Sequence, residues 1–157
     1  MKHIAQNNRA GMRITGQVEI IVQDARTGCV LSRQRIKNLV VTAGLNLIRD
    51  RLSGSGNALS HFATGTGATA VNPAQTALVT EVTREAITQT ITTTPAQLTV
   101  KYYMATGVGN GNTLAEVGVF NAAAAGTMFA RAKLSSTIAK TSAVTITFTW
   151  TFDLSAT

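Results

Sequence analysis

The clearest pattern of hydrophobic and polar residues lies near the C-terminus, in residues 144–154. Every second residue there is apolar, namely Val144, Ile146, Phe148, Trp150, Phe152 and Leu154. The residues between them are four threonines and Asp153. A period of two predicts a β-strand with one buried face. Because each of these apolar side chains contributes about 1.5–3 kcal/mol when fully buried, we expect this strand to lie at the centre of the core.

Alternation of the same kind predicts strands along most of the chain. Residues 15–23 and 29–37 are predicted to form a β-hairpin around a turn in which Gly28 takes a positive φ. The stretch from His61 to Arg84 is predicted to be a strand, a wide loop and a second strand. Further strands are expected at residues 85–94, 98–106, 114–120 and 127–134, with residues 135–142 connecting to the final strand. About eight strands separated by turns indicate a mainly β fold, an antiparallel β-sandwich of jelly-roll type.

Residues 42–52 carry a helical period instead. Leu45, Ile48 and Leu52 recur at a spacing of three and four residues, and Thr42 is a suitable N-cap. The sequence SGSG at residues 53–56 ends the pattern. We therefore expect one short helix whose Leu/Ile stripe packs on the edge or end of a sheet.

The chain is divided by its polarity into two parts. Residues 1–13 are polar and lack periodicity, which predicts an N-terminal arm that orders against neighbouring subunits. Residues 14–157 are long enough for a single sandwich domain. No apolar run is long enough for a transmembrane helix, and the N-terminus shows no secretory signal, so we expect synthesis in a cytoplasm and no membrane partner.

Positive charge is concentrated in the first third of the chain. Residues 1–51 contain nine Lys/Arg and three Asp/Glu, whereas the remaining residues contain five and four. The candidate interface cations are Arg9, Arg13, Arg33, Arg35 and Lys37, the last three on one face of a predicted strand. A solvated strand face is the alternative interpretation. Aromatic residues are not interleaved with these cations, so nucleic acid is not a favoured partner, and an acidic protein surface is the simpler one.

Residues capable of catalysis or metal binding are sparse. His3 and His61 are the only histidines, and Cys29 is the only cysteine, which either packs at a strand start or forms an intersubunit disulfide. The glycine-rich loops near residues 65 and 107 lack the frames of phosphate-binding or dinucleotide-binding loops. Glu81 and Glu116 are the best carboxylate candidates, and Glu81 is expected to pair with Arg84 or to cap a turn. We therefore predict a protein without enzymatic activity, cofactor or metal.

Three segments carry a family resemblance: NLVVTAGLNLIRDRL, HFATGTGATAVNPAQTALVTEVTR and TLAEVGVFNAAAAGTMFARAKL. Together they resemble modules of tailed-bacteriophage virion proteins of the tail-fibre and tail-collar type, over residues 36–152. The resemblance implies a virion structural protein, assembled in the cytoplasm of a bacterial host. Its implied partners are copies of itself and other virion proteins, in a fibre base, a collar or a baseplate-associated part.

Two other interpretations are open. The chain lacks the repetitive shaft and receptor-binding tip of long fibres, which favours a capsid-decoration (cement) protein that clamps major-capsid subunits. The other is a carbohydrate-binding module in which Tyr102, Tyr103 or Trp150 stacks on a host-surface glycan, although Trp150 is expected in the core. In either case the recognition residues are expected at exposed loop tips, and the candidates are Thr66, Asn72, Asn110 and Asn112.

Overall fold

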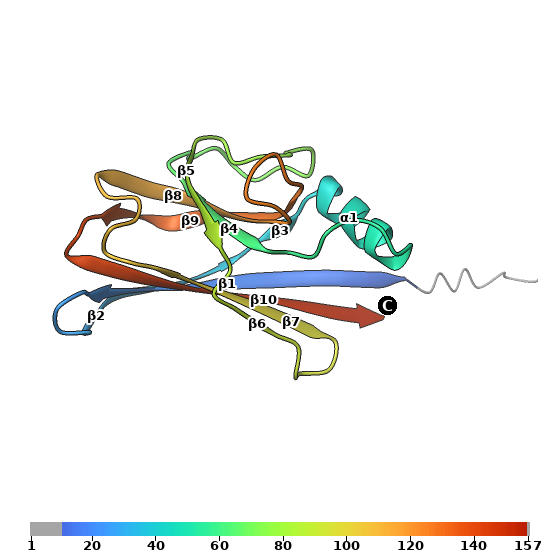
Figure 1. Ribbon diagram of the computed structural model, residues 1–157, viewed down its shortest axis with the longest axis horizontal. Helices are drawn as coiled ribbons and strands as arrows, with labels where there is room; N and C mark the ends of the chain where they lie inside the picture. Colours follow the sequence, from blue (N-terminus) through green and yellow to red (C-terminus); the bar gives the residue numbers. More distant parts are fainter. Residues whose placement is uncertain (1–10, 157) are drawn as a thin grey trace, which may run out of the picture.

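Figure 1 shows the computed structural model, which describes residues 11–156. Two antiparallel sheets of five strands pack face to face, and the helix α1 (Thr42–Leu52) lies at one end. In the first sheet the strands follow the order β2 (Val30–Lys37), β1 (Met12–Asp24), β10 (Val144–Ala156), β7 (Gln97–Met104) and β6 (Gln89–Ile91). In the second the order is β3 (Leu39–Val40), β9 (Met128–Lys140), β8 (Asn112–Phe120), β4 (His61–Gly65) and β5 (Glu81–Ala86). The predicted mainly β, antiparallel sandwich is confirmed.

The C-terminal strand β10 lies at the centre of the first sheet, as its alternation predicts. Phe148 and Trp150 are fully buried, and the Phe62 ring of the opposite sheet lies 4.9 Å and 5.7 Å from their ring centroids. Edge-on and offset contacts of this kind add about 0.5–1.5 kcal/mol to each pair beyond the buried area. Leu154 is the exception on this face, because it is 37% exposed at the end of the strand.

Residues 66–80 form a loop that packs on the outer face of the second sheet (Figure 1). Beneath this loop lies a second, smaller core, in which Leu78 packs with Phe120, Met128, Ala63 and Val41. The second sheet therefore has buried residues on both faces, whereas the outer face of the first sheet is open.

The helix has the predicted bounds but turns a different face to the sheet. Leu45 is 51% exposed and Leu52 is 82% exposed, while Gly44 and Leu47 are buried. A Cβ atom at position 44 would collide with the carbonyl group of Phe129 in β9, so only glycine allows this close approach. The predicted contact face is therefore right at Ile48, which packs against the core, and wrong at Leu45 and Leu52, because the fit of Gly44 against β9 decides the rotation of the helix.

The helix also starts without the predicted cap. Val41 occupies the N-cap position and no side chain caps the helix, so Thr42 is not the N-cap. The Thr42 amide donates instead to the carbonyl oxygen of Pro73 in the 66–80 loop, 2.9 Å away. A tertiary contact thus satisfies one of the amides that a side-chain cap would otherwise satisfy.

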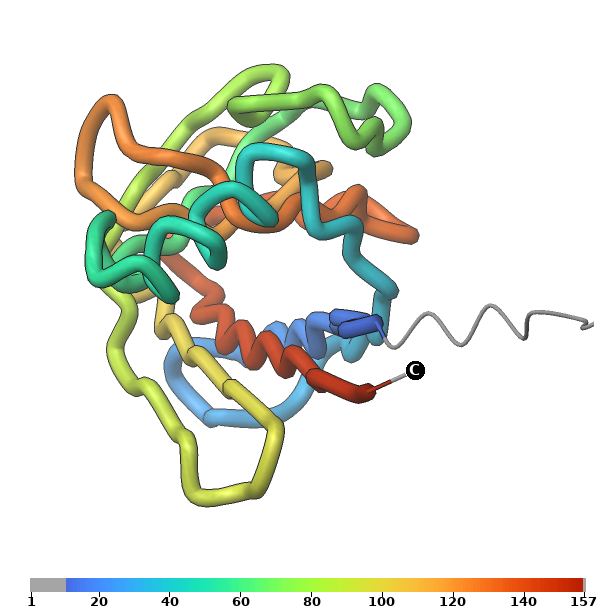
Figure 2. Tube along the Cα trace, turned by 90° about the vertical axis from the view of Figure 1, so that its right-hand side faces the viewer, coloured from blue at the N-terminus to red at the C-terminus, as the bar shows by residue number. Residues whose placement is uncertain are grey.

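Several predicted boundaries move. Strand β1 begins at Met12, which pairs with Ala156, so Met12 and Arg13 belong to the sheet and not to an arm. Residues 1–10 lie outside the described residues. The predicted strand over residues 85–94 splits, because β5 belongs to the second sheet and β6 to the first. Residues 135–140, expected as a connection, continue β9. Figure 2 views the molecule from the end where β1 begins, where β10 stops and where α1 lies.

Candidate functional site

The histidine and the carboxylates considered for chemistry hold structural positions. His61 begins β4, and its Nδ1 lies 2.8 Å from the hydroxyl of Ser60. Glu81 pairs with Arg84, as expected, with 2.6 Å between Oε2 and Nη2. Across residues 11–156, no three His, Cys, Asp or Glu side chains lie close enough to hold a metal ion. His3 lies outside the described residues.

Glu116 and Arg131 form an ion pair that is completely buried on the outer face of the second sheet. The Nε of Arg131 lies 2.7 Å from Oε2 of Glu116, and both side chains have no solvent exposure. The residues come from the neighbouring strands β8 and β9, where Gly118 is the direct partner of Arg131, so the pair is diagonal. Buried charges are costly unless they are paired and hydrogen-bonded, so the surroundings of this pair explain why it is tolerated.

The backbone of the 66–80 loop satisfies both members of the pair. Glu116 accepts hydrogen bonds from the amides of Gly67, Val79 and Thr80, at 3.1, 3.1 and 2.8 Å. On the other side, Arg131 donates to the carbonyl oxygen of Thr69 at 3.0 Å and to the side chain of Gln75 at 3.1 Å. The ion pair therefore fastens the loop to the sheet.

The same ion pair explains two glycines, Gly65 at the end of β4 and Gly67 in the loop. A Cβ atom on Gly65 or Gly67 would collide with the side chain of Glu116. These glycines thus leave room for a carboxylate of the protein itself, whose oxygens accept the loop amides that a phosphate-binding loop would offer to a ligand. Sequence reasoning did not predict the pair, although charged residues inside the apolar segments LAEVGVF and FARAKL were a signal for it.

Lys140 holds the glycine-rich loop near residue 109 in a similar way. Its Nζ donates to the carbonyl oxygens of Thr141 and Thr106 at 2.9 and 3.3 Å, and to Oδ1 of Asn110 at 3.0 Å. The side chain is 1% exposed, and burial lowers the pKa of the Lys140 ammonium. With three oxygen acceptors filling its three donors, Lys140 is occupied by a structural task.

The four candidate recognition residues in loops divide into two groups. Asn72 and Asn110 are exposed, whereas Thr66 and Asn112 are half-buried and do not lie at exposed tips. The asparagines are committed to local turns, since Asn72 accepts from the amide of Ala74 at 2.8 Å and Asn112 donates to the carbonyl oxygen of Gly109 at 3.0 Å. These side chains thus shape the loops that carry them.

The predicted cationic face lies on β2, at one edge of the first sheet. Arg33, Arg35 and Lys37 are all exposed, and β2 pairs only with β1 among the described strands. Glu19 on β1 lies opposite Arg35, with 2.8 Å between Arg35 Nε and Oε1, and the same oxygen is 3.9 Å from Arg33. One carboxylate therefore serves two of three cations, which leaves the edge positive.

The ion pairs of this edge contribute little to folding. The Arg33 and Arg35 side chains are 54% and 66% exposed. Exposed pairs of this kind are worth about 0.2–1 kcal/mol because water and salt screen them. Three exposed cations along an edge strand also oppose strand pairing with an identical edge, since like charges repel. The charge of this edge therefore opposes pairing between two β2 strands.

The inner side of β2 is anchored to the second sheet through Gln34. Its side chain accepts hydrogen bonds from the Ser135 hydroxyl at 2.8 Å and the Ser136 amide at 3.1 Å, and donates to the Ser136 carbonyl oxygen at 2.8 Å. These bonds connect β2 to β9. The strand is thus held in place from behind while its outer side faces solvent.

Beside the cationic edge, the outer face of the first sheet is polar, and it carries the charged residues Glu19, Lys101 and Asp153 among uncharged ones. Thr147, Thr149 and Thr151 of β10 lie half-buried along its middle, with Gln17 of β1 beside Thr151, whereas Thr145 of β10 and Thr99 of β7 are buried. The hydroxyl oxygens of Thr99 and Thr151 lie 3.3 Å apart across the neighbouring strands β7 and β10. On the same face, Tyr103 of β7 is 49% exposed. A surface with few charges to desolvate is typical of the centre of a protein interface.

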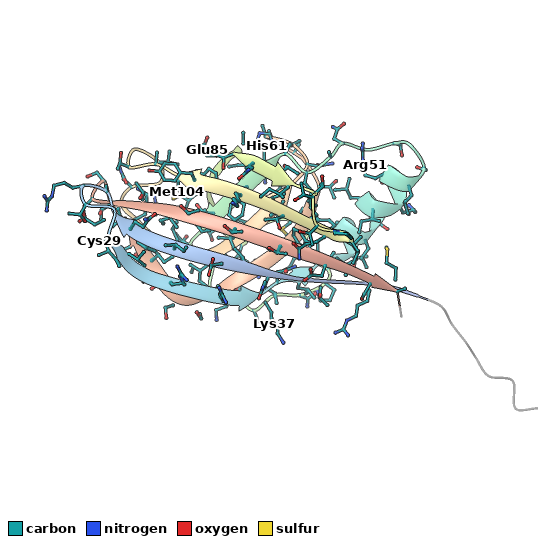
Figure 3. All side chains as sticks on the ribbon, turned by 90° about the horizontal axis from the view of Figure 1, so that it is seen from below. Cys29, Lys37, Arg51, His61, Glu85 and Met104 are labelled. Carbon is teal, nitrogen blue, oxygen red and sulfur yellow. The ribbon has the colours of Figure 1, made fainter. Side chains whose placement is uncertain are left out.

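The remaining interface candidates lie near the ends of this sheet. Arg13 is exposed near the start of β1, and Arg9 lies outside the described residues. Cys29 is exposed beside the β1–β2 turn, as Figure 3 shows together with Lys37 at the other end of β2. The interpretation of Cys29 as a packed residue is therefore wrong, because the hairpin projects beyond the core. An intersubunit disulfide stays a prediction.

The turn itself is built as predicted. Gly28 has φ 73°, the positive value expected for it. The carboxylate of Asp24 accepts hydrogen bonds from the Thr27 amide at 2.7 Å, the Thr27 hydroxyl at 2.8 Å and the Arg26 amide at 3.0 Å. The bonds from Thr27 hold the pKa of the Asp24 carboxyl below its usual value.

The aromatic residues considered for sugar stacking are mostly in the core. Trp150 has no exposure, which confirms its expected place, and Tyr102 is 3% exposed and stacks on Phe62. Burial, with a smaller contribution from the charge of Glu85, raises the pKa of Tyr102 well above its usual value. Tyr103 is left as the one exposed aromatic among the three.

Comparisons of the chain with protein-family models, with curated proteins and with solved structures found no match. Within residues 11–156, no helix is long and apolar enough to cross a membrane.

Proposed function

We propose that the protein is a non-enzymatic structural component of a phage particle, which assembles through the open face of the first sheet and its cationic β2 edge. The particle and its tail location come from the resemblance of the three segments quoted above. The surface comes from the residues that are open to a partner. The partners proposed are copies of the chain and an acidic surface of another virion protein.

The observation that carries the proposal is the contrast between the two sheets. The second sheet is covered on its outer face by the 66–80 loop, and the ion pair of Glu116 with Arg131 fastens that cover. Within residues 11–156 no loop covers the outer face of the first sheet, whose edge strand β2 carries Arg33, Arg35 and Lys37. A scaffold that closes one face with buried polar contacts and leaves the other uncovered by its described residues is suited to docking.

The charge of the edge supports an acidic partner in particular. Complementary charge raises the rate of association and fixes the register of two surfaces more than it adds affinity. An identical β2 edge from a second copy would bring six cations together, so self-association is better placed on the threonine-rich face than on β2.

The test is incorporation into particles of a variant with the three edge cations neutralised, Arg33→Gln, Arg35→Gln and Lys37→Gln. The matched control neutralises three other exposed cations, Arg26→Gln, Arg49→Gln and Lys133→Gln. We expect the first variant to fold with a melting temperature close to that of the unmodified protein and to be depleted from purified particles, while the control is retained. Equal retention of both variants would contradict the role of the edge.

A capsid-decoration protein is the second candidate, since a clamp between capsid subunits would use the same open face. Copy number in purified particles separates the two, because a cement protein covers the head in many copies and a tail part is present in few. A glycan-binding module is the third, and it depends on Tyr103. Binding to a glycan array that is lost in Tyr103→Ala would support this third function over assembly.

A further inference from the structure

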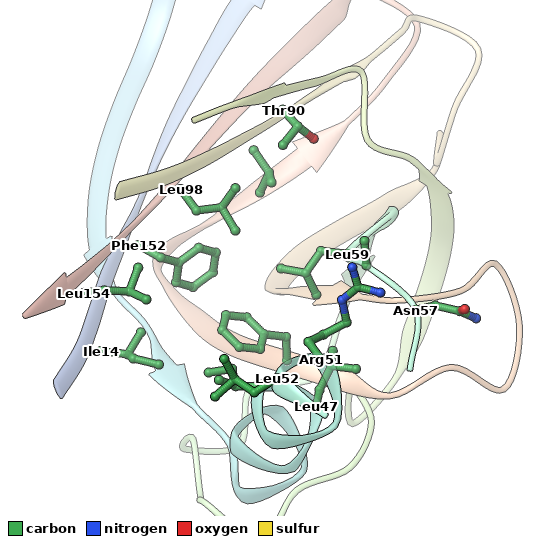
Figure 4. A pocket seen from close by; sticks show the side chains of 14 residues that line it. Ile14, Leu47, Arg51, Leu52, Asn57, Leu59, Thr90, Leu98, Phe152 and Leu154 are labelled. Atoms are coloured by element: carbon green, nitrogen blue, oxygen red, sulfur yellow. The ribbon is translucent and has the colours of Figure 1, made fainter. Parts of the chain in front are cut away.

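An apolar pocket opens at the end of the sandwich, away from the β2 edge. Its volume is about 340 Å³, and it lies between α1 and the strands β7 and β10 (Figure 4). Leu47, Leu98 and Phe152 line it, and Ile14 and Leu154 lie at the ends of their strands. This volume is within the range of about 300–1,000 Å³ found for small-molecule sites.

The residues at the mouth are unusually apolar for an open surface. Leu52 is 82% exposed and Leu154 is 37% exposed, although both border the pocket. Eleven of the fourteen lining residues are apolar, and the others are Arg51, Asn57 and Thr90. A contiguous exposed apolar patch of this kind marks a site that binds a ligand or a partner with an apolar surface.

Arg51 is the one charged residue in the lining among the described residues, and Figure 4 shows its guanidinium beside Leu59. Its Nη1 donates to the carbonyl oxygen of Gly56 at 2.8 Å, and no carboxylate pairs with it within residues 11–156. The neighbouring Asp50 is held by Arg49, with 2.7 Å between Oδ1 and Nη2. The mouth of the pocket therefore carries one positive group with donors to spare.

The apolar lining of the pocket and the single cationic side chain at its mouth, Arg51, define the kind of ligand that fits. The guanidinium group offers five N–H donors in a planar fork that matches carboxylate geometry, while the Leu and Phe side chains exclude water from an alkyl chain. A neutral alkyl chain would leave Arg51 unused, and a cationic one would be repelled by it.

We propose that this pocket binds a free medium-chain carboxylate, with the alkyl chain between Leu98 and Phe152 and the carboxylate on Arg51. The site is separate from the assembly surface, because Leu98 and Phe152 point to the inner face of the first sheet, whereas the assembly surface is the outer face and the β2 edge. A failure of the ligand experiment leaves the edge-cation experiment unaffected, and the reverse also holds.

The experiment uses the full chain and titrates decanoate, below its micelle concentration, by isothermal calorimetry and by displacement of the fluorescent sulfonate anilinonaphthalene sulfonate. Decanol and decyltrimethylammonium are the matched ligands without the negative charge. We expect saturable binding of decanoate and at least about tenfold weaker binding of both matched ligands, since a charge-assisted hydrogen bond is worth about 1.5–3 kcal/mol. No decanoate binding would overturn the site.

Two variants locate the ligand. Arg51→Gln should weaken decanoate about tenfold and leave decanol unchanged, while Arg26→Gln, an exposed cation of the β1–β2 turn outside the pocket, should change neither. Ala58→Trp fills the mouth from an exposed position and should abolish both anilinonaphthalene sulfonate and decanoate binding.

The melting temperature of each variant checks that it folds. If Ala58→Trp does not fold, Arg51→Gln still decides the site, because Arg51 is exposed and its removal leaves the core intact. Equal affinity for decanoate and decanol would overturn the proposal that the ligand is an anion. It would point to an apolar segment of another protein as the occupant of the pocket. Unchanged decanoate binding in Arg51→Gln would overturn the proposed site.

Discussion

The buried ion pair of Glu116 with Arg131 offers the sharpest test of how this fold is held together. In Arg131→Met, the Glu116 carboxylate keeps the hydrogen bonds from the amides of Gly67, Val79 and Thr80 but loses the one cationic partner that it has within residues 11–156. Breaking a fully buried pair by removing one member costs about 3–5 kcal/mol, because an uncompensated charge stays in the interior. The same loss of stability is expected for Glu116→Gln, which leaves the buried guanidinium of Arg131 without its carboxylate partner.

The assay is urea denaturation, in which both the midpoint and the m-value, the slope of the unfolding free energy against urea concentration, are measured. We expect a lower midpoint at an unchanged m-value, which reports lost stability and not a changed unfolded state. At about 2–4 °C for each kcal/mol in a domain of this size, the melting temperature should fall by about 6–20 °C. Glu19→Gln is the control, since its pair with Arg35 is exposed and should cost only about 0.2–1 kcal/mol.

The double variant Glu116→Gln with Arg131→Met separates pairing from simple loss of packing. It removes both charges, so its cost should be smaller than the sum of the two single costs, with a coupling energy of about 0.5–3 kcal/mol. Limited proteolysis should cut the 66–80 loop faster in both single variants, because the loop loses its attachment. Single variants that cost less than about 1 kcal/mol, or costs that simply add, would refute this account of the pair.

Four further variants test the core and the helix face. Trp150→Ala should lower the free energy of unfolding by about 3–5 kcal/mol, and an unchanged melting temperature would show that this face of β10 is not core. In urea denaturation, Leu47→Ala should lower the free energy of unfolding by about 2–5 kcal/mol, whereas Leu52→Ala should change it by no more than about 0.5 kcal/mol. The reverse order would show that Leu52 belongs to the buried face of the helix, as predicted from the sequence. Tyr102→Phe removes a buried hydroxyl without a hydrogen-bond partner in the described residues and should not destabilise at neutral pH. The pKa of Tyr102 in the folded state lies above the unfolded value of about 10, so above that pH the folded state keeps a proton that the unfolded chain releases. The free energy of unfolding therefore falls as pH rises above about 10. In melting curves at alkaline pH, Tyr102→Phe should lose this part of the decline.

Residues whose role is local were predictable from the sequence. The alternation from residue 144 to 154 determines a half-buried strand, since successive side chains point to opposite faces whatever the rest of the chain does. Asp24, Thr27 and Gly28 determine the hairpin turn for the same reason, because their hydrogen bonds and the positive φ lie within a few residues. Polarity and a helical period determined the bounds of α1.

Contacts between distant residues were decided only by the tertiary structure. Glu116 and Arg131 are fifteen residues apart, and only the register of β8 with β9 and the covering loop make them a pair. The rotation of α1 depends on whether a Cβ atom at position 44 clears the carbonyl group of Phe129, which no helical period records. The pocket beside Arg51 likewise exists only where α1 meets β7 and β10. Local patterns fix which side chains share a face, whereas the partner of each face follows from how the two sheets and the helix pack.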